Sequence, residues 1–338
     1  MNLFPILVAG AAAASPAPKP EDLRVYDDWT VGCDNGRGCQ AVGLVPENWP
    51  DDAATIVIAR GPEAGAAPEV SIAMREGMGT ALEVDGKRLP LRLAAGKGEA
   101  KVAAADVPAL IAAIRSGNEL KVVGADGAAV GTASLKGASA ALLYMDDRQQ
   151  RVGTVTALDR SGARPASSVP PPPKLPVVRA VPLTRAAPIA VGSARIKALR
   201  TKHGCTIDEV GGPDSAEVYA LSANQSLVLL ACGSGAYNVS HVPFVATRRG
   251  RAITIALAPF DVKPDWWDNG LPILVNADWD PAGGLLGSFS KGRGLGDCGT
   301  TSSYAWDGSR FRLVEEATMG ECRGSIDYIT VWRARVVR

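Results

Sequence analysis

The feature that most constrains the fold is a proline-rich segment near the middle of the 338-residue chain. Residues 160–190 contain eight prolines and almost no helical or strand periodicity. Proline lacks an amide hydrogen and fixes its own backbone, so such a run is extended and semi-rigid. It predicts a linker over 159–190 that separates two folded domains, 22–158 and 191–338. Two domains also suit a chain of this length.

The linker region is strongly basic, although the whole chain is nearly neutral. Residues 151–202 hold ten Lys and Arg and a single acid, Asp159, while the net charge of the chain is +1. The overall balance argues against a nucleic-acid-binding protein. The local excess could attract anionic envelope surfaces such as phospholipid headgroups, or it could simply keep a spacer soluble.

The N-terminus has the pattern of a secretory signal peptide. An apolar run from Leu3 ends in small residues, with Ala12 and Ala14 in A-x-A spacing, which predicts a signal peptide over 1–14 and a periplasmic protein. The run is too short for a transmembrane anchor. A frayed alanine-rich terminus is the alternative.

Export to the periplasm would place the six cysteines in an oxidising compartment, which favours disulfides. The sequence contains no C-x-x-C pair and only two histidines, His203 and His241, so no metal site is expected. The linker isolates one pair from the other four, and local strand pairing favours one of three pairings among those four. The expected bridges are Cys33–Cys39, Cys205–Cys232 and Cys298–Cys322.

The first domain is predicted to be α+β, with an antiparallel sheet covered by two helices. Strand-like segments occur at 55–60, 69–74 and 81–93. A helix is predicted over 106–117, with Asp106 as its cap and Gly117 at its end, and a second over 138–153. The apolar face of the first helix is predicted to consist of Val107, Leu110, Ile111 and Ile114.

The second domain is predicted to be mainly antiparallel β, as a sandwich or a curled meander. A short helix is expected over 193–204. Segments with strand composition and turn residues between them then follow one another from 217 to 337, with almost no helix punctuation.

Several motifs together resemble a bacterial exported family, domain of unknown function 1176. They are "SFSKGRGLGDCGTTSSYAWDGSRF", "ECRG", "VWRA", "ACGSGAYN" and "DWTVGC…CQAVG", and the resemblance runs from about Arg24 to Val336. The W-x-V-x-C then C pattern is also similar to the invasion-associated locus B family, small periplasmic or surface proteins of α-proteobacteria. The resemblance implies an exported location and a fold, but no reaction and no cofactor.

"GLGDCG" reads literally as G-x-G-x-x-G, with Gly294, Gly296 and Gly299 in place. A nucleotide cradle needs a helix after the third glycine, whereas "TTSSYAWDG" is a poor helix former, so no nucleotide is expected. The stretch instead predicts a hairpin turn tied by a disulfide. Its Lys291 and Arg293 are candidate ligand-binding residues.

A second candidate region combines acids with paired tryptophans, between residues 261 and 280. Carboxylates can flank a glycosidic bond and tryptophans stack on sugar rings, so a glycan site is possible. Turn-forming Asp with core Trp is the alternative, and calcium is disfavoured because Ala282 and Phe289 fall at ligand positions. The candidate residues are Asp261, Asp265, Trp266, Trp267, Asp268, Asp278 and Asp280.

Two functional classes remain open. The first is a non-catalytic envelope protein that binds a protein, a glycan or an anionic surface polymer. The second is a periplasmic glycan hydrolase using 261–280. No catalytic residue is assigned, because no nucleophile motif accompanies the two histidines.

Overall fold

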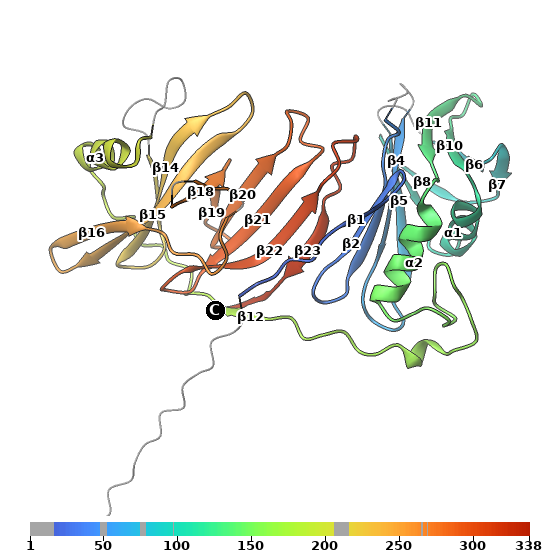
Figure 1. Cartoon of the computed structure of the whole chain (residues 1–338), viewed down its shortest axis with the longest axis horizontal. Helices are drawn as coiled ribbons and strands as arrows, with labels where there is room; N and C mark the ends of the chain where they lie inside the picture. Colours follow the sequence, from blue (N-terminus) through green and yellow to red (C-terminus); the bar gives the residue numbers. More distant parts are fainter. Residues whose placement is uncertain are drawn as a thin grey trace, which may run out of the picture.

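A computed structural model describes residues 17–47, 53–74, 79–96, 98–205, 216–264, 266–268 and 270–338. Within these residues the chain is mostly antiparallel β, with several sheets and three α-helices. The predicted signal peptide lies outside them. Figure 1 shows an elongated molecule with blue-to-green elements at one end, yellow and orange elements at the other and the red C-terminal strands between them, with residues 159–190 running along one side.

The first part of the chain contains two sheets and two helices, α1 (Val107–Ser116) and α2 (Ala138–Arg148). The seven-stranded sheet has, in spatial order, β1 (Arg24–Tyr26), β2 (Trp29–Cys33), β3 (Cys39–Gly43), β4 (Ala54–Arg60), β5 (Pro68–Met74), β9 (Glu99–Val102) and β8 (Leu93–Gly96). The four-stranded sheet has β11 (Ala129–Ser134), β10 (Glu119–Val123), β6 (Ala81–Val84) and β7 (Lys87–Leu89).

One face of the seven-stranded sheet is buried against both helices and the four-stranded sheet. Trp29, Ile56 and Ile72 of the large sheet meet Leu110 and Leu142 of the helices in one core, and all five are fully buried. Apolar area removed from water is the main favourable contribution to such packing. The opposite face of this sheet turns toward the second part of the chain, where it will form a cavity wall.

Helix α1 confirms the predicted helix, its four buried residues and its end at Gly117. Asp106 is at the N-cap position, as predicted, but its side chain forms no capping hydrogen bond. Its carboxylate accepts hydrogen bonds from Arg92 instead, from the backbone N at 2.8 Å and from Nε at 3.2 Å. The N–H groups of Arg92 thus take the place of the N–H groups of the helix, from which a capping carboxylate would accept.

The second part of the chain consists of two further antiparallel sheets. The six-stranded sheet has β13 (Ala216–Ala220), β14 (Gln225–Ser234), β15 (Val239–Arg249), β18 (Leu271–Val275) and β17 (Trp266–Asp268), with β16 (Ala252–Leu257) also on β15. The five-stranded sheet has β19 (Asp278–Asp280), β20 (Leu285–Lys291), β21 (Gly299–Trp306), β22 (Phe311–Met319) and β23 (Ile329–Arg333).

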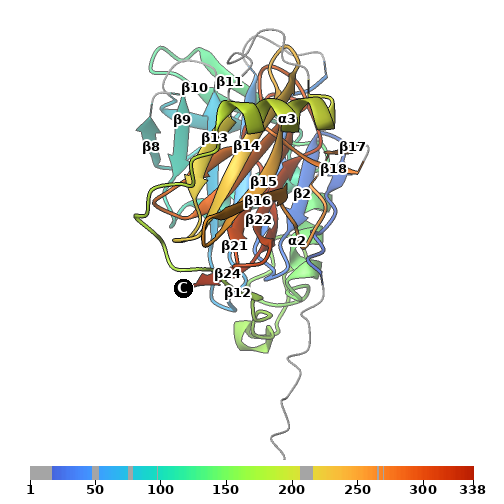
Figure 2. The same cartoon turned by 90° about the vertical axis from the view of Figure 1, so that its left-hand side faces the viewer.

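These two sheets share one buried cluster, to which Leu227 and Leu229 contribute from one side and Tyr304 and Phe311 from the other. The outer face of the six-stranded sheet carries a separate cluster beneath helix α3 (Ser193–His203), which confirms the third predicted helix. In Figure 2 this helix crosses the front of β13 to β16. No helix in the described ranges is long and apolar enough to cross a membrane.

The linker is extended, as predicted, but it is also attached along its length. Its strand β12 (Val177–Arg179) pairs in parallel with the last strand, β24 (Arg335–Val337). Val169, Val178 and Ile189 are buried. Val178 packs in an apolar cluster with residues of the five-stranded sheet, so burial of linker side chains accounts for the attachment.

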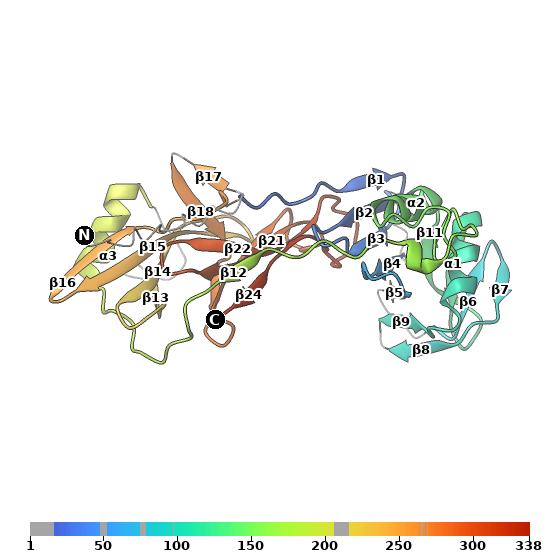
Figure 3. The same cartoon turned by 90° about the horizontal axis from the view of Figure 1, so that it is seen from below.

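The two parts of the chain meet where β23 lies beside β2 and β3. Val42 and Leu44 pack against Met319 and Ile329 in a small fully buried cluster. The N-terminal segment runs alongside, and Glu21 donates its backbone N–H to Val331 O at 3.1 Å. Figure 3 shows this segment and the linker both crossing between the two ends.

The structure has the three expected disulfides, Cys33–Cys39, Cys205–Cys232 and Cys298–Cys322, and no free cysteine. Cys33 and Cys39 are direct partners in the β2–β3 register, so the first bridge closes a tight hairpin. Three disulfides indicate an oxidising location outside the cytoplasm.

A buried ion pair fixes helix α2 to the seven-stranded sheet. Arg60 Nη2 lies 2.7 Å from Asp146 Oδ1, and both side chains are fully buried. The Asp146 carboxylate also accepts from the backbone N–H groups of Leu158 and Asp159 at 2.7 and 2.8 Å. These donors offset the cost of removing its charge from water.

We therefore expect Asp146→Asn to destabilise the protein strongly, by about 3–5 kcal/mol, because Arg60 is left buried without a counter-charge. Urea unfolding followed by circular dichroism measures the loss. Asp147→Asn, at the exposed neighbouring position, should change stability by less than about 0.5 kcal/mol. Equal losses in the two variants would contradict the assigned role.

Candidate functional site

The disulfide-closed hairpin between β2 and β3 is held by one carboxylate. Asp34 Oδ1 accepts hydrogen bonds from Gly36 N at 2.7 Å and from Gly38 N at 3.0 Å. The Asp34 side chain is only 4% exposed, so these donors replace the water it has lost. The Cys33–Cys39 disulfide closes the same loop and limits its alternatives.

The same carboxylate binds Arg333 from the far end of the chain. Arg333 Nε lies 2.6 Å from Asp34 Oδ2. Next to it, Asn35 Oδ1 accepts from Arg333 N at 2.8 Å, and Asn35 Nδ2 donates to Arg333 O at 3.0 Å. A Cβ on Gly38 would lie 2.8 Å from Asp34 Oδ2 and 2.9 Å from Arg333 Nη2, so a larger residue there would displace this ion pair. The hairpin is therefore bound to the end of β23 by one ion pair and two hydrogen bonds.

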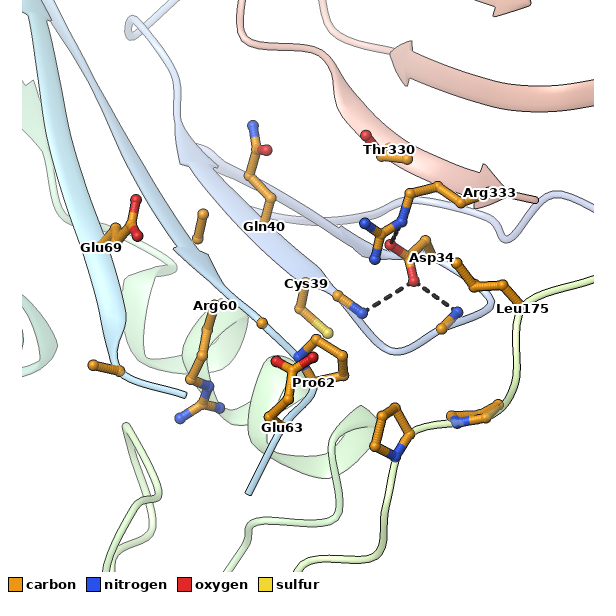
Figure 4. A pocket seen from close by; sticks show the side chains of 17 residues that line it. Asp34, Cys39, Gln40, Arg60, Pro62, Glu63, Glu69, Leu175, Thr330 and Arg333 are labelled. Atoms are coloured by element: carbon orange, nitrogen blue, oxygen red, sulfur yellow. Dashed lines mark hydrogen bonds and ion pairs between the residues drawn. The ribbon is translucent and has the colours of Figure 1, made fainter. Parts of the chain in front are cut away.

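A cavity of about 590 Å³ opens at this junction, between the hairpin, the seven-stranded sheet, the linker and β23. We call it the cleft. Figure 4 shows its lining side chains, with Asp34, Arg333 and Leu175 on one side and Glu69 on the other. The lining residues are Asp34, Gly36, Gly38, Cys39, Gln40, Ala59, Arg60, Gly61, Pro62, Glu63, Ala67, Glu69, Pro172, Pro173, Leu175, Thr330 and Arg333.

The sheet contributes a row of side chains at one level across three strands. Gln40 is the register partner of Ala59, and Ala59 is the partner of Glu69. Side chains of directly paired residues lie on the same face of a sheet, so the three share the cleft face. Gln40 Nε2 also donates to Asp327 O at 3.1 Å, which links this row to the loop before β23.

The charges in the cleft do not balance one another. Arg333 is paired with Asp34, and Arg60 with Asp146, so both lining cations are neutralised by buried acids. Glu63 and Glu69 are exposed and form no ion pair with any residue that the structure describes, although the charge of Glu63 also interacts with that of the buried Arg151 beside it. The cleft is therefore net acidic.

Acidic character extends beyond the lining to the loop before β23. Burial raises the pKa of Asp327, and the charge of Glu99 on β9 raises it further. Ser325 Oγ donates to Asp327 Oδ2 at 3.3 Å but supplies no positive charge. A cation placed here would lower that pKa and favour the ionised acid.

The stretch 291–299 forms the predicted turn. A Cβ on Gly299, at φ +136°, would lie 2.0 Å from Ser290 O, so the turn requires glycine there. Strand β21 begins at Gly299, so the helix that a dinucleotide cradle requires does not follow. The second and third glycines thus serve chain packing rather than phosphate contact.

The two candidate cations of this turn differ. Arg293, a candidate ligand-binding residue in the sequence, is held within the turn by Asp297, with Nε 2.7 Å from Oδ1. That hydrogen bond lowers the pKa of Asp297, which also accepts from Gly324 N at 2.7 Å. Lys291 Nζ lies 5.4 Å from the Phe289 ring centroid.

In the Asp/Trp region, the acids whose side chains the structure describes include two that are engaged in structural contacts, Asp261 and Asp280. Asp265 lies outside the described residues, and Trp266, Trp267 and Asp268 form β17, a strand paired with β18. Asp261 is held by Arg312, with Nε 2.8 Å from its carboxylate. Asp280 caps its own turn by accepting from Ala282 and Gly283. Over the part of the chain that the structure describes, no group of three His, Cys, Asp or Glu side chains could hold a metal ion.

Sequence reasoning missed the cleft, although its motifs pointed to the right segments. Asp34 lies between the two cysteines of "DWTVGC…CQAVG", and Arg333 lies in "VWRA". Motifs from the two ends of the chain also meet at a second contact. Arg323 of "ECRG" pairs with Asp28 of "DWTVGC" and donates from Nε to Val45 O at 2.8 Å. Motifs from both ends of the chain thus come together at one joint.

We expect Arg293→Ala to cost roughly 1.5–3 kcal/mol of stability, because it leaves the buried Asp297 carboxylate without its charged donor. Lys291→Ala, two residues earlier, should cost only about 0–1 kcal/mol. Urea unfolding of both variants gives the comparison. If Lys291→Ala proved the more damaging, the structural role given to Arg293 would be wrong.

Asp327→Asn should stabilise the protein at pH 7, raising its melting temperature by about 1–3 °C. The folded state disfavours the Asp327 carboxylate, so the parent binds more protons folded than unfolded and gains stability as the pH falls through its raised pKa. The advantage of the variant should vanish below about pH 3.9. Thermal unfolding at several pH values measures it, and a lowered melting temperature at pH 7 would contradict the expectation.

Comparison with known proteins confirms the family resemblance. A family model described as "Protein of unknown function (DUF1176)" matches residues 23–335. The chain is 29% identical over 365 residues to "Uncharacterized protein YpfG" of Escherichia coli (strain K12), covering 98% of this chain and 97% of that protein. A crystal structure of invasion associated protein B from Bartonella henselae matches 38% of this chain and 99% of its own, at 18% identity and a TM-score of 0.29, which is too low to carry an argument. The match over 23–335 shows that the chain belongs to the DUF1176 family.

Proposed function

We propose that the protein is an exported, non-catalytic component of the cell envelope, and that its cleft binds an extended, positively charged segment of another envelope protein. One observation carries this proposal. Both lining arginines are neutralised by buried aspartates, whereas Glu63 and Glu69 remain exposed to an incoming ligand. Complementary charge selects partners and speeds their encounter.

The apolar part of the lining supports a peptide carrying Lys or Arg. Pro62 and Pro172 offer rigid apolar surface beside Glu63, and Leu175 extends it along the linker. Lys and Arg have long aliphatic stems that pack on such surface while the charged head reaches a carboxylate. The row formed by Gln40 and Glu69 adds hydrogen-bonding groups for an extended chain.

The alternative, a glycan hydrolase that uses the acids of 261–280, has less support than the binding function. Asp261 is already engaged by Arg312, and Asp280 is used in its own turn. In the cleft itself, Cys39 is bound in a disulfide. The lining supplies fixed charges and hydrogen bonds, which suit binding.

The proposal also includes the organisation and compartment expected from the sequence. Residues 22–158 and 191–338 would be two domains, joined by the linker 159–190, with the cleft at their junction. A signal peptide over 1–14 would direct the protein to the periplasm, where the three disulfides can form.

The test replaces the two free carboxylates of the cleft by Glu63→Gln and Glu69→Gln together. Binding of a fluorescein-labelled peptide of alternating Lys and Ala is measured by anisotropy at about 50 mM salt, where exposed charges are weakly screened. We expect the double variant to bind about three- to tenfold more weakly, because two exposed charge contacts are lost.

The matched control is Asp22→Asn with Asp147→Asn, which removes two exposed acids outside the cleft lining. It changes net charge by the same amount, so it should leave affinity within about twofold. Equal weakening in both double variants would mean that the overall field, and not the cleft, attracts the peptide. Stronger binding of a Glu–Ala peptide would overturn the proposal outright.

A further inference from the structure

One end face of the molecule carries six exposed cations. Three are on helix α3, and three are at the turn between β15 and β16 of the six-stranded sheet. Helix α3 and the turn between β15 and β16 lie together at the end farthest from α1, and Figure 2 views this face directly. The cations are Arg195, Lys197 and Lys202 on α3, and Arg248, Arg249 and Arg251 at the hairpin turn. We call this surface the basic end face.

The two segments that carry these cations contain no acid of their own, and the acids between them are Asp208, Glu209, Asp214 and Glu217. Residues 160–205 contain no Asp or Glu, and neither do residues 218–260. Within the described part of the chain, none of the six cations forms an ion pair. Since the whole chain carries only +1, its positive charge is concentrated at this end.

The helix contributes its cations on both sides of an outward ridge. Its inner side is fixed by Ile196, which is buried, and by Arg200, which donates from Nη1 to Ala231 O at 2.9 Å. At 3.6 residues per turn, Arg195 and Lys202 project on one flank and Lys197 on the other. Small exposed residues such as Ala198 form the ridge between them. A flat surface can therefore approach the helix closely while cations reach it from both sides.

The hairpin extends the same face. Arg248 is the register partner of Ile253, and Ile253 packs in the cluster beneath α3, so Arg248 projects on the helix side of the sheet. Arg249 and Arg251 flank Gly250, at the turn itself. The two groups of cations thus share a broad face rather than one line.

We propose that the basic end face docks onto an anionic phospholipid bilayer. Long cationic side chains spread over a face suit a fluid surface whose headgroups move to meet each charge, and each such cation strengthens attachment to an anionic membrane. The apolar side of α3 stays packed on the sheet, so attachment would rest on charge rather than on insertion of the helix. Docking would leave the cleft accessible, since the cleft is lined by other elements.

The test is co-sedimentation of the full mature chain with vesicles of phosphatidylethanolamine and phosphatidylglycerol in a ratio of about 3:1, at low salt. We expect binding that is lost in vesicles of phosphatidylcholine alone and at high salt. R195Q/K197Q/K202Q and R248Q/R249Q/R251Q should each weaken binding at least about tenfold, at roughly three- to fivefold per cation.

The control K19Q/K87Q/R88Q removes three exposed cations elsewhere and should change binding less than about twofold. Circular dichroism of each variant shows that it folds, and Glu63→Gln with Glu69→Gln should bind vesicles as the parent does. Binding indifferent to phosphatidylglycerol, or weakened equally by the control, overturns the proposal. Binding of soluble dextran sulfate without any binding to vesicles would overturn it in favour of a polymer ligand.

Discussion

The arrangement of the two parts of the chain depends on one buried carboxylate. Asp34 accepts two backbone N–H groups of its own hairpin and forms an ion pair with the guanidinium of Arg333. A buried charge is tolerated only when its lost hydration is replaced, and two hydrogen bonds and one counter-charge achieve this. The hairpin must therefore close correctly before it can hold β23, which couples the local disulfide turn to the long-range joint.

The charge distribution of the cleft follows from that pairing. Asp34 neutralises Arg333, and Asp146 neutralises Arg60, so the two arginines that line the cavity form structural ion pairs. The acids at the rim then dominate what a ligand meets. At the far end of the molecule the balance is opposite, since α3 and the β15–β16 turn carry six exposed cations and no acid within these elements. A net charge of +1 conceals this separation.

Local patterns allowed much of the fold to be predicted from the sequence. Helix α1 is marked by Pro108 in its first turn and Gly117 after its last, and its apolar spacing identified the buried face. The disulfides join residues near in sequence, such as Cys298 and Cys322, so local strand pairing indicated them. These features depend on information within a few tens of residues.

The cleft could not be predicted in this way, because its parts are remote in sequence. Asn35 and Arg333 are 298 positions apart, and no periodicity relates them. The linker was expected to be a spacer, yet Val178 is buried and pairs with the last strand. Arg293 shows a different limit: its partner Asp297 is only four residues away, but a pair within one turn carries no periodicity that would indicate it.

The joint between the two parts draws on the beginning, middle and end of the chain, and this makes a rigid cleft the natural expectation. Glu21 is bound to Val331, the linker strand β12 to β24, and the β2–β3 hairpin to Arg333. Opening the cleft would require breaking several of these contacts and exposing the apolar cluster around Leu44 together. A site that is held open in advance loses less conformational freedom when a ligand binds. The linker therefore contributes to binding as a structural wall, in addition to joining the two parts.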